Sequence, residues 1–220
     1  MNSMNFKTKI VVSIFSFFLT ISSLKAQNTQ SLLSEVSNKV KSYENIQIDF
    51  KYSLENTREN VKQDTRANIT LKGDNYVLNM LGVTRIFDGK TIYTIVPEDE
   101  EVTISDYSKE EDKSISVSEM LTFYEKGYNY KMDIQQNIRG RKIQFIKLSP
   151  IDSTTEIKNI LLGIDMQTKH IYKLIQIDSS GTNYTITVNS FKTNQPISQN
   201  LFIFDEEKYT NQGYYINKLE

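Results

Sequence analysis

The sequence predicts a domain that is mainly β with a few helices. About eleven short segments alternate apolar and polar residues, as in Ile46, Ile48 and Phe50, each of which is followed by a polar residue. Turn pairs such as Asp88-Gly89 separate these segments, and an Asp-Gly pair is a strong β-hairpin signal. So many strands in one domain must close into a barrel, stack as a sandwich, or curve around something.

The first element is an amphipathic helix over residues 30–43. Its apolar residues recur at helical spacing, and the period changes to two at Ile46, so the helix should end near Asn45. The strands that we expect after it are 46–54, 67–71, 76–80, 92–96, 102–104, 128–134, 143–148, 157–166, 171–177, 184–188 and 201–204.

A second, short helix interrupts these strands. Ser116 and Glu119 have the spacing of a capping box, and a run of apolar residues follows before Gly127. The two helices are separated by about 70 residues of strand, so we expect each to cover the concave or open side of the sheet and not to pack on the other.

The N-terminus reads as a secretory signal. Lys7 and Lys9 precede an apolar run over residues 10–21, which falls short of the roughly 20 apolar residues that span a bilayer, so a membrane anchor is the weaker alternative. We expect cleavage after Ala26. Residues 1–26 are then a signal peptide and residues 27–220 a single exported domain, without a cysteine to carry a lipid.

Composition argues against several classes of function. The 26 Lys and Arg residues balance 27 Asp and Glu residues, which disfavours nucleic-acid binding. The chain has no Cys and one His, which excludes thiol nucleophiles and disfavours zinc clusters and the common catalytic triads. His170 lies between two expected strands and is more typical of a turn residue than of a base or a ligand. We therefore expect no enzyme, no cofactor and no metal.

Aromatic residues are abundant, with 13 Tyr and 11 Phe. Core packing explains most of them. The alternative is that part of this apolar surface lines a cavity open to an apolar guest, which is the usual composition of a ligand site.

The sequence resembles a known family, the periplasmic outer-membrane lipoprotein carriers (LolA-like), in the form seen in Bacteroidetes-type bacteria. The resemblance spans the expected mature chain. The stretches that carry it are Tyr43 with 46–50, the turn at 71–76, Phe-Asp-Gly-Lys-Thr-Ile-Tyr at 87–93, then 121–128 and 202–205.

The resemblance implies an incomplete antiparallel β-barrel of about eleven strands, with a helical lid over an apolar concave face. It implies a single lipoprotein-carrier domain that takes acylated lipoproteins as cargo from an inner-membrane ABC-type transporter and delivers them through the periplasm to the outer membrane. The outer-membrane acceptor stays unidentified, and we expect a monomer.

The same resemblance supplies candidate site residues. The cavity lining would be Phe50, Tyr52, Ile69, Leu71, Leu78, Met80 and Tyr93. The lid would be Met120, Leu121, Phe123 and Tyr124. Tyr76 is the candidate contact for the transporter. Gly73 stands where many members carry an arginine that latches the lid, so that role is transferred to no residue here.

Two alternatives from other classes remain open. The same fold could serve a periplasmic sensor or regulatory module that detects lipids, or a carrier of a glycolipid or another lipid.

Overall fold

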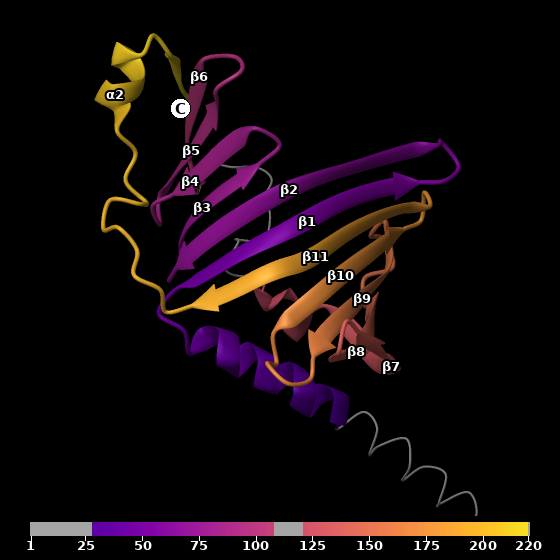
Figure 1. The fold of residues 1–220 in the computed structure, drawn as a ribbon. Helices are drawn as coiled ribbons and strands as arrows, with labels where there is room; N and C mark the ends of the chain where they lie inside the picture. The colour runs from indigo at the N-terminus through magenta and orange to yellow at the C-terminus, as the bar shows by residue number, and fades with distance from the viewer. Residues whose placement is uncertain (1–27, 108–120, 220) are drawn as a thin grey trace, which may run out of the picture.

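The computed structural model describes residues 28–107 and 121–219, which form one open, curved sheet (Figure 1). Within these residues the sheet has twelve strands in the order β12-β6-β5-β4-β3-β2-β1-β11-β10-β9-β8-β7. Neighbouring strands are antiparallel except for β12, which is parallel to β6. The sheet is not closed into a barrel, so the predicted mainly β, incomplete barrel is confirmed.

Strands β3–β6 have five or six residues each, while the strands from β2 to β7 in the sheet order are longer. The strands are β1 (Ile46–Asn56), β2 (Val61–Lys72), β3 (Asn75–Met80), β4 (Val83–Phe87), β5 (Thr91–Val96), β6 (Glu101–Asp106), β7 (Tyr128–Ile138), β8 (Arg141–Pro150), β9 (Ile157–Asp165), β10 (Ile171–Asp178), β11 (Thr182–Thr193) and β12 (Tyr215–Lys218).

An N-terminal helix over residues 28–41 lies across the ends of β10 and β11 (Figure 1). Leu32, Leu33 and Val36 share one face of this helix, and that face packs into a buried cluster. The strand residues of the cluster are Ile146, Leu148, Ile160, Leu162, Ile164 and Ile171. The helix therefore covers the concave side of β8, β9 and β10, as its amphipathic pattern predicts.

The C-terminal segment covers the opposite face of the sheet at β3–β6. Phe202 is buried there against Val77, Ile86 and Val102, and Tyr209 and Tyr214 pack around them. This segment includes the short helix α2 (Glu206–Asn211), which Asp205 caps by accepting a hydrogen bond from the Lys208 amide. The segment therefore lies on the face opposite the one that carries Ile69, Leu71 and Ile92.

Several elements differ from the sequence prediction. Strands β4 and β12 were not expected, and residues 201–204, expected as a strand, are not one, since residues 199–202 form a turn and Phe202 is buried in the core. The described part of the expected mid-chain helix is the 3-10 turn η3 (Phe123–Glu125). The capping box at residues 116–119, Met120 and the expected signal peptide lie outside the described residues.

Candidate functional site: an apolar cavity on the concave face

The central cavity lies on the concave face of β1, β2, β3, β10 and β11, and it has a volume of about 280 Å³. Alternating side chains from paired strands build it, since Ile48 pairs with Ile69 and Phe50 pairs with Val188. Its lining residues are Ile48, Phe50, Tyr52, Ile69, Leu71, Leu78, Met80, Leu121, Ile171, Leu174, Ile186, Val188 and Phe191. Among these described residues none is charged, so the cavity suits an apolar guest.

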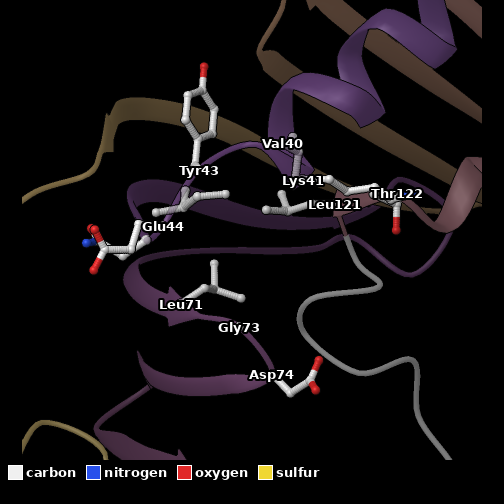
Figure 2. Close-up of a pocket in the computed structure, with 11 residues that line it drawn as sticks. Val40, Lys41, Tyr43, Glu44, Leu71, Gly73, Asp74, Leu121 and Thr122 are labelled. Carbon is white, nitrogen blue, oxygen red and sulfur yellow. The ribbon is translucent and has the colours of Figure 1, made fainter.

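A second cavity of about 300 Å³, the helix-end cavity, adjoins the central cavity where the N-terminal helix ends (Figure 2). It shares Leu71 and Leu121 with the central cavity. Its lining residues are Val40, Lys41, Tyr43, Glu44, Asn45, Ile46, Leu71, Gly73, Asp74, Leu121 and Thr122. This lining is more polar than that of the central cavity, because it includes three charged side chains.

A third cavity of about 370 Å³, the strand-end cavity, adjoins the central cavity on its other side and shares Tyr52, Leu174 and Ile186 with it. Its lining residues are Tyr52, Phe123, Tyr128, Ile157, Ile160, Leu174, Gln176, Asp178, Tyr184 and Ile186. Burial raises the pKa of Tyr52 and of Tyr128, so both hydroxyls stay protonated and can donate hydrogen bonds.

The three cavities follow one row of side chains on β1. Ile46 lines the helix-end cavity, Ile48 and Phe50 line the central cavity, and Tyr52 lines both the central and the strand-end cavities. At about 3.3 Å per residue, the row from Ile46 to Tyr52 is about 20 Å long. The concave face therefore carries an elongated site and not a single round pocket.

The structure brings six of the seven expected lining residues together in the central cavity, namely Phe50, Tyr52, Ile69, Leu71, Leu78 and Met80. It does not bring Tyr93 there. Tyr93 lies on the opposite face of β5, where its ring stacks on Phe204 with ring centroids 4.5 Å apart and its hydroxyl donates to Asp88 Oδ2. Its neighbour Ile92 is the β5 residue on the concave side.

The expected lid residues have different positions. Leu121 lines both the central and the helix-end cavities, and Phe123 lines the strand-end cavity. Tyr124 is instead 1% exposed in the cluster beneath the N-terminal helix, and burial raises its pKa. Met120 lies outside the described residues.

A polar contact joins η3 to the N-terminal helix. Glu125 accepts a hydrogen bond from the Ser37 hydroxyl and forms an ion pair of 2.7 Å with the Lys41 ammonium. The hydrogen bond from Lys41 lowers the pKa of the Glu125 carboxyl most, and the hydrogen bond from Ser37 lowers it further. Gly73 lies at a φ of +57° in the turn between β2 and β3, and it has no side chain for such a contact.

Tyr76, the expected transporter contact, lies in the core. It is 6% exposed, and its ring centroid lies 5.6 Å from that of Phe87. In this conformation the ring offers little surface to another protein.

The sequence analysis missed the contribution of β10 and β11 to the cavity. Ile171 and Leu174 on β10, with Ile186, Val188 and Phe191 on β11, supply more than a third of its lining residues. The alternating pattern of both strands was visible in the sequence. It did not show which strands lie beside β1, and that pairing decides which of their faces joins the lining.

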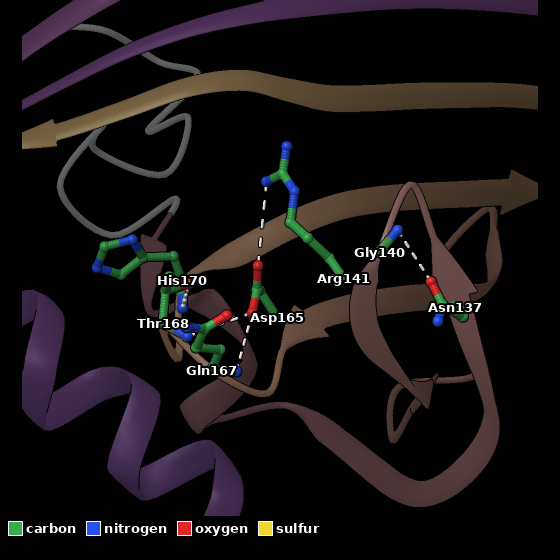
Figure 3. Close-up of polar contacts among 7 residues, drawn as sticks. All are labelled: Asn137, Gly140, Arg141, Asp165, Gln167, Thr168 and His170. Atoms are coloured by element: carbon green, nitrogen blue, oxygen red, sulfur yellow. Dashed lines mark hydrogen bonds and ion pairs between the residues drawn. The ribbon is translucent and has the colours of Figure 1, made fainter.

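His170 lies at the end of the turn between β9 and β10 (Figure 3). Asp165 organises this turn by accepting hydrogen bonds from the amides of Gln167 and Thr168. The His170 ring stacks on Phe191 at 4.0 Å, and its Nε2 lies 2.8 Å from the Tyr43 hydroxyl. His170 thus connects the end of the N-terminal helix to the rim of the central cavity. Across the described ranges, no three His, Asp or Glu side chains lie close enough to hold a metal ion.

His170 is expected to make folding stability depend on pH. Burial, and then the charge of Lys39, lowers its pKa, while Asp165 opposes the shift. The unfolded chain therefore binds the proton more readily, so acidification through about pH 6.5 should lower the free energy of unfolding. Urea denaturation near pH 7.5 and near pH 5.5 should show a smaller loss in His170→Gln than in the wild-type protein. An equal loss in both proteins would contradict this role.

Comparison with known proteins agrees with the geometry. A family model described as outer membrane lipoprotein carrier protein LolA matches residues 81–205. A search of curated protein sequences finds no match. In the part of the chain that the structure describes, no helix is long and apolar enough to cross a membrane.

The structure is similar to solved structures at low sequence identity. An uncharacterized conserved protein from Thermus thermophilus has a TM-score of 0.58 and 8% identity, over 87% of this chain and 99% of that one. LprF from Mycobacterium bovis has a TM-score of 0.49 and 13% identity, over 79% and 96% of the two chains. The LolA superfamily protein NE2245 from Nitrosomonas europaea has a TM-score of 0.43 and 13% identity, over 80% and 97%. Since the family model matches more than half of the chain, the protein belongs to the LolA family of outer-membrane lipoprotein carriers.

Proposed function

We propose that this protein is a periplasmic carrier, which binds the acyl chains of lipoproteins released from the inner membrane and delivers them to the outer membrane. Membership of the LolA family supports a lipid- or lipoprotein-binding role. The observation that carries the proposal is the central cavity, because its lining is apolar and it lies on the concave face of the sheet.

The energetics of acyl chains explain why such a carrier is needed. Moving an acyl chain into water costs about 0.8 kcal/mol per methylene, so a chain of roughly fifteen methylenes faces about 12 kcal/mol. Transfer from a bilayer to an apolar cavity exchanges one apolar environment for another, and little net free energy separates the two. A donor that supplies energy, such as an inner-membrane ABC-type transporter, would then drive loading.

Carriage needs no reaction, and the chain's imidazole supports a non-enzymatic role. His170 is stacked on Phe191 and contacts the Tyr43 hydroxyl, so its ring is engaged in packing the helix end. Nε2 faces the Tyr43 hydroxyl, so a role as catalytic base would fall to Nδ1 alone.

The test is to purify the protein from the periplasm of its own host and to identify what accompanies it by native mass spectrometry and lipid extraction. Acylated lipoproteins in a near one-to-one ratio would support the carrier. If a free lipid or glycolipid accompanies the protein, the cavity is still the binding site, but the cargo is that lipid and not a lipoprotein. An empty protein that also takes up no lipoprotein from membranes containing the transporter would overturn the proposal and favour a regulatory module.

A further inference from the structure

The three cavities differ in polarity along the row of β1 side chains. The central cavity is apolar, while the helix-end cavity is lined by Lys41, Glu44 and Asp74, which come from the helix end, the following loop and the turn between β2 and β3. In Figure 2, Leu71 is drawn between the carboxylates of Glu44 and Asp74. The apolar central cavity thus adjoins a cavity with a charged lining. We call this charged end of the row the mouth.

The charged groups at this mouth are in contact with water. The side chains of Lys41 and Glu44 are 56% and 71% exposed, even though they pair with Glu125 and Lys72 respectively. Asp74 forms no hydrogen bond or ion pair with the described residues. A peptide chain that leaves the site must keep its polar groups hydrated or hydrogen-bonded, and this mouth allows both.

The strand-end cavity is a poorer exit. Its only carboxylate among the described lining residues, Asp178, is half-buried and accepts a hydrogen bond of 3.0 Å from Gln176. Most of its other lining residues are aliphatic or aromatic, including Ile157, Ile160 and Phe123. Such a wall suits hydrocarbon better than a hydrated peptide.

The length of the row fits this orientation. One acyl chain is about 15 Å long, since two leaflets make a hydrocarbon core of about 30 Å. At about 3.3 Å per residue, a chain whose polar end lies near Ile46 would extend about four to five residues along β1, pass Ile48 and reach the level of Phe50 in the central cavity.

From this arrangement we propose that the helix-end cavity is the subsite for the polar head and first peptide residues of an acylated protein, whose hydrocarbon chains run into the central cavity and toward the strand-end cavity. This inference rests on the proposed carrier function. Leu71 and Leu121, which the two adjoining cavities share, then contact the cargo where its hydrocarbon meets its polar linkage.

The natural chain contains no cysteine, so a single substituted cysteine gives a unique reactive site. Asp74→Cys places a thiol at the helix-end cavity, and Asp178→Cys, with the same residue change, places one at the strand-end cavity. The probe is a synthetic peptide with a dipalmitoyl-glyceryl cysteine at its N-terminus and a bromoacetyl group on the next side chain. The rate of alkylation by the probe is divided, for each variant, by the rate of alkylation by iodoacetamide, which measures the intrinsic reactivity of the thiol.

Asp74→Cys is expected to be alkylated at least about tenfold faster than Asp178→Cys, because a bound probe holds its reactive group at high effective concentration beside the thiol. The same peptide without acyl chains should show no preference. Equal rates, or a faster reaction of Asp178→Cys, would overturn the assignment of the head subsite.

Displacement of a fluorescent fatty acid from the wild-type protein separates this failure from failure of the carrier function. If the acylated peptide displaces the fatty acid and the thiol rates show no preference for Asp74→Cys, the carrier stands and the subsite is wrong. If the peptide displaces nothing, the carrier function fails, and the subsite with it.

Discussion

Ile186→Asp is expected to lower the affinity for a fluorescent fatty acid by at least about a hundredfold, which corresponds to about 3 kcal/mol. Ile186 lies at the centre of β11, pairs with Tyr52 and Leu174, and lines both the central and the strand-end cavities. A carboxylate there faces the hydrocarbon guest without a cationic partner among these neighbours, and burying it unpaired is costly. Fluorescence titration of the purified protein measures the effect.

Thr187→Asp is the matched control. It adds the same charge one residue further along β11, on the opposite face of the sheet, where Thr187 pairs with Lys51 and Lys173. This variant should bind the fatty acid like the wild-type protein. Circular dichroism and urea denaturation check that both variants fold. A folded Ile186→Asp protein with unchanged affinity would show that the guest does not lie in the central cavity.

Alternation along the strands made most of the cavity predictable. Residues of one strand that are two apart share a face, so Phe50 and Tyr52 on β1, and Leu78 and Met80 on β3, line the same cavity, as expected from the sequence. The exception, Tyr93, shows the weakness of the method. A strand has two faces, and placing a residue one position along the pattern moves it to the other face. The position of Tyr93 in the family motif suggested that it lines the cavity. In the structure its neighbour Ile92 is the residue on the concave side.

Features that depend on contacts distant in the chain were not predictable. β12 joins the sheet as a parallel partner of β6, and Phe202, in a segment expected as a strand, packs instead in a cluster with Ile86 and Val102. Neither contact leaves a local pattern. The shape of the site is also non-local, because Leu121 separates the central from the helix-end cavity and lies 50 residues from its neighbour there, Leu71.

Tyr124 was expected in the lid, and its burial leads to a second large effect. Tyr124→Ala is expected to lower the free energy of unfolding by about 3–5 kcal/mol, because it removes a ring that is packed against Leu33, Val36 and Leu148. The Tyr124 hydroxyl is buried and has no hydrogen-bond partner in the described structure. Tyr124→Phe should therefore leave stability unchanged or raise it by up to about 1 kcal/mol.

Urea denaturation of both variants beside the wild-type protein tests the pair of expectations. The comparison separates packing from hydrogen bonding, since Tyr124→Phe retains the ring and loses the hydroxyl, while Tyr124→Ala loses both. A mobile lid residue would tolerate the alanine with a change below about 1 kcal/mol, as exposed positions do. A large loss in Tyr124→Ala alone would instead make the Tyr124 ring part of the fixed core, while Leu121 and Phe123, which precede it in the chain, line the cavities.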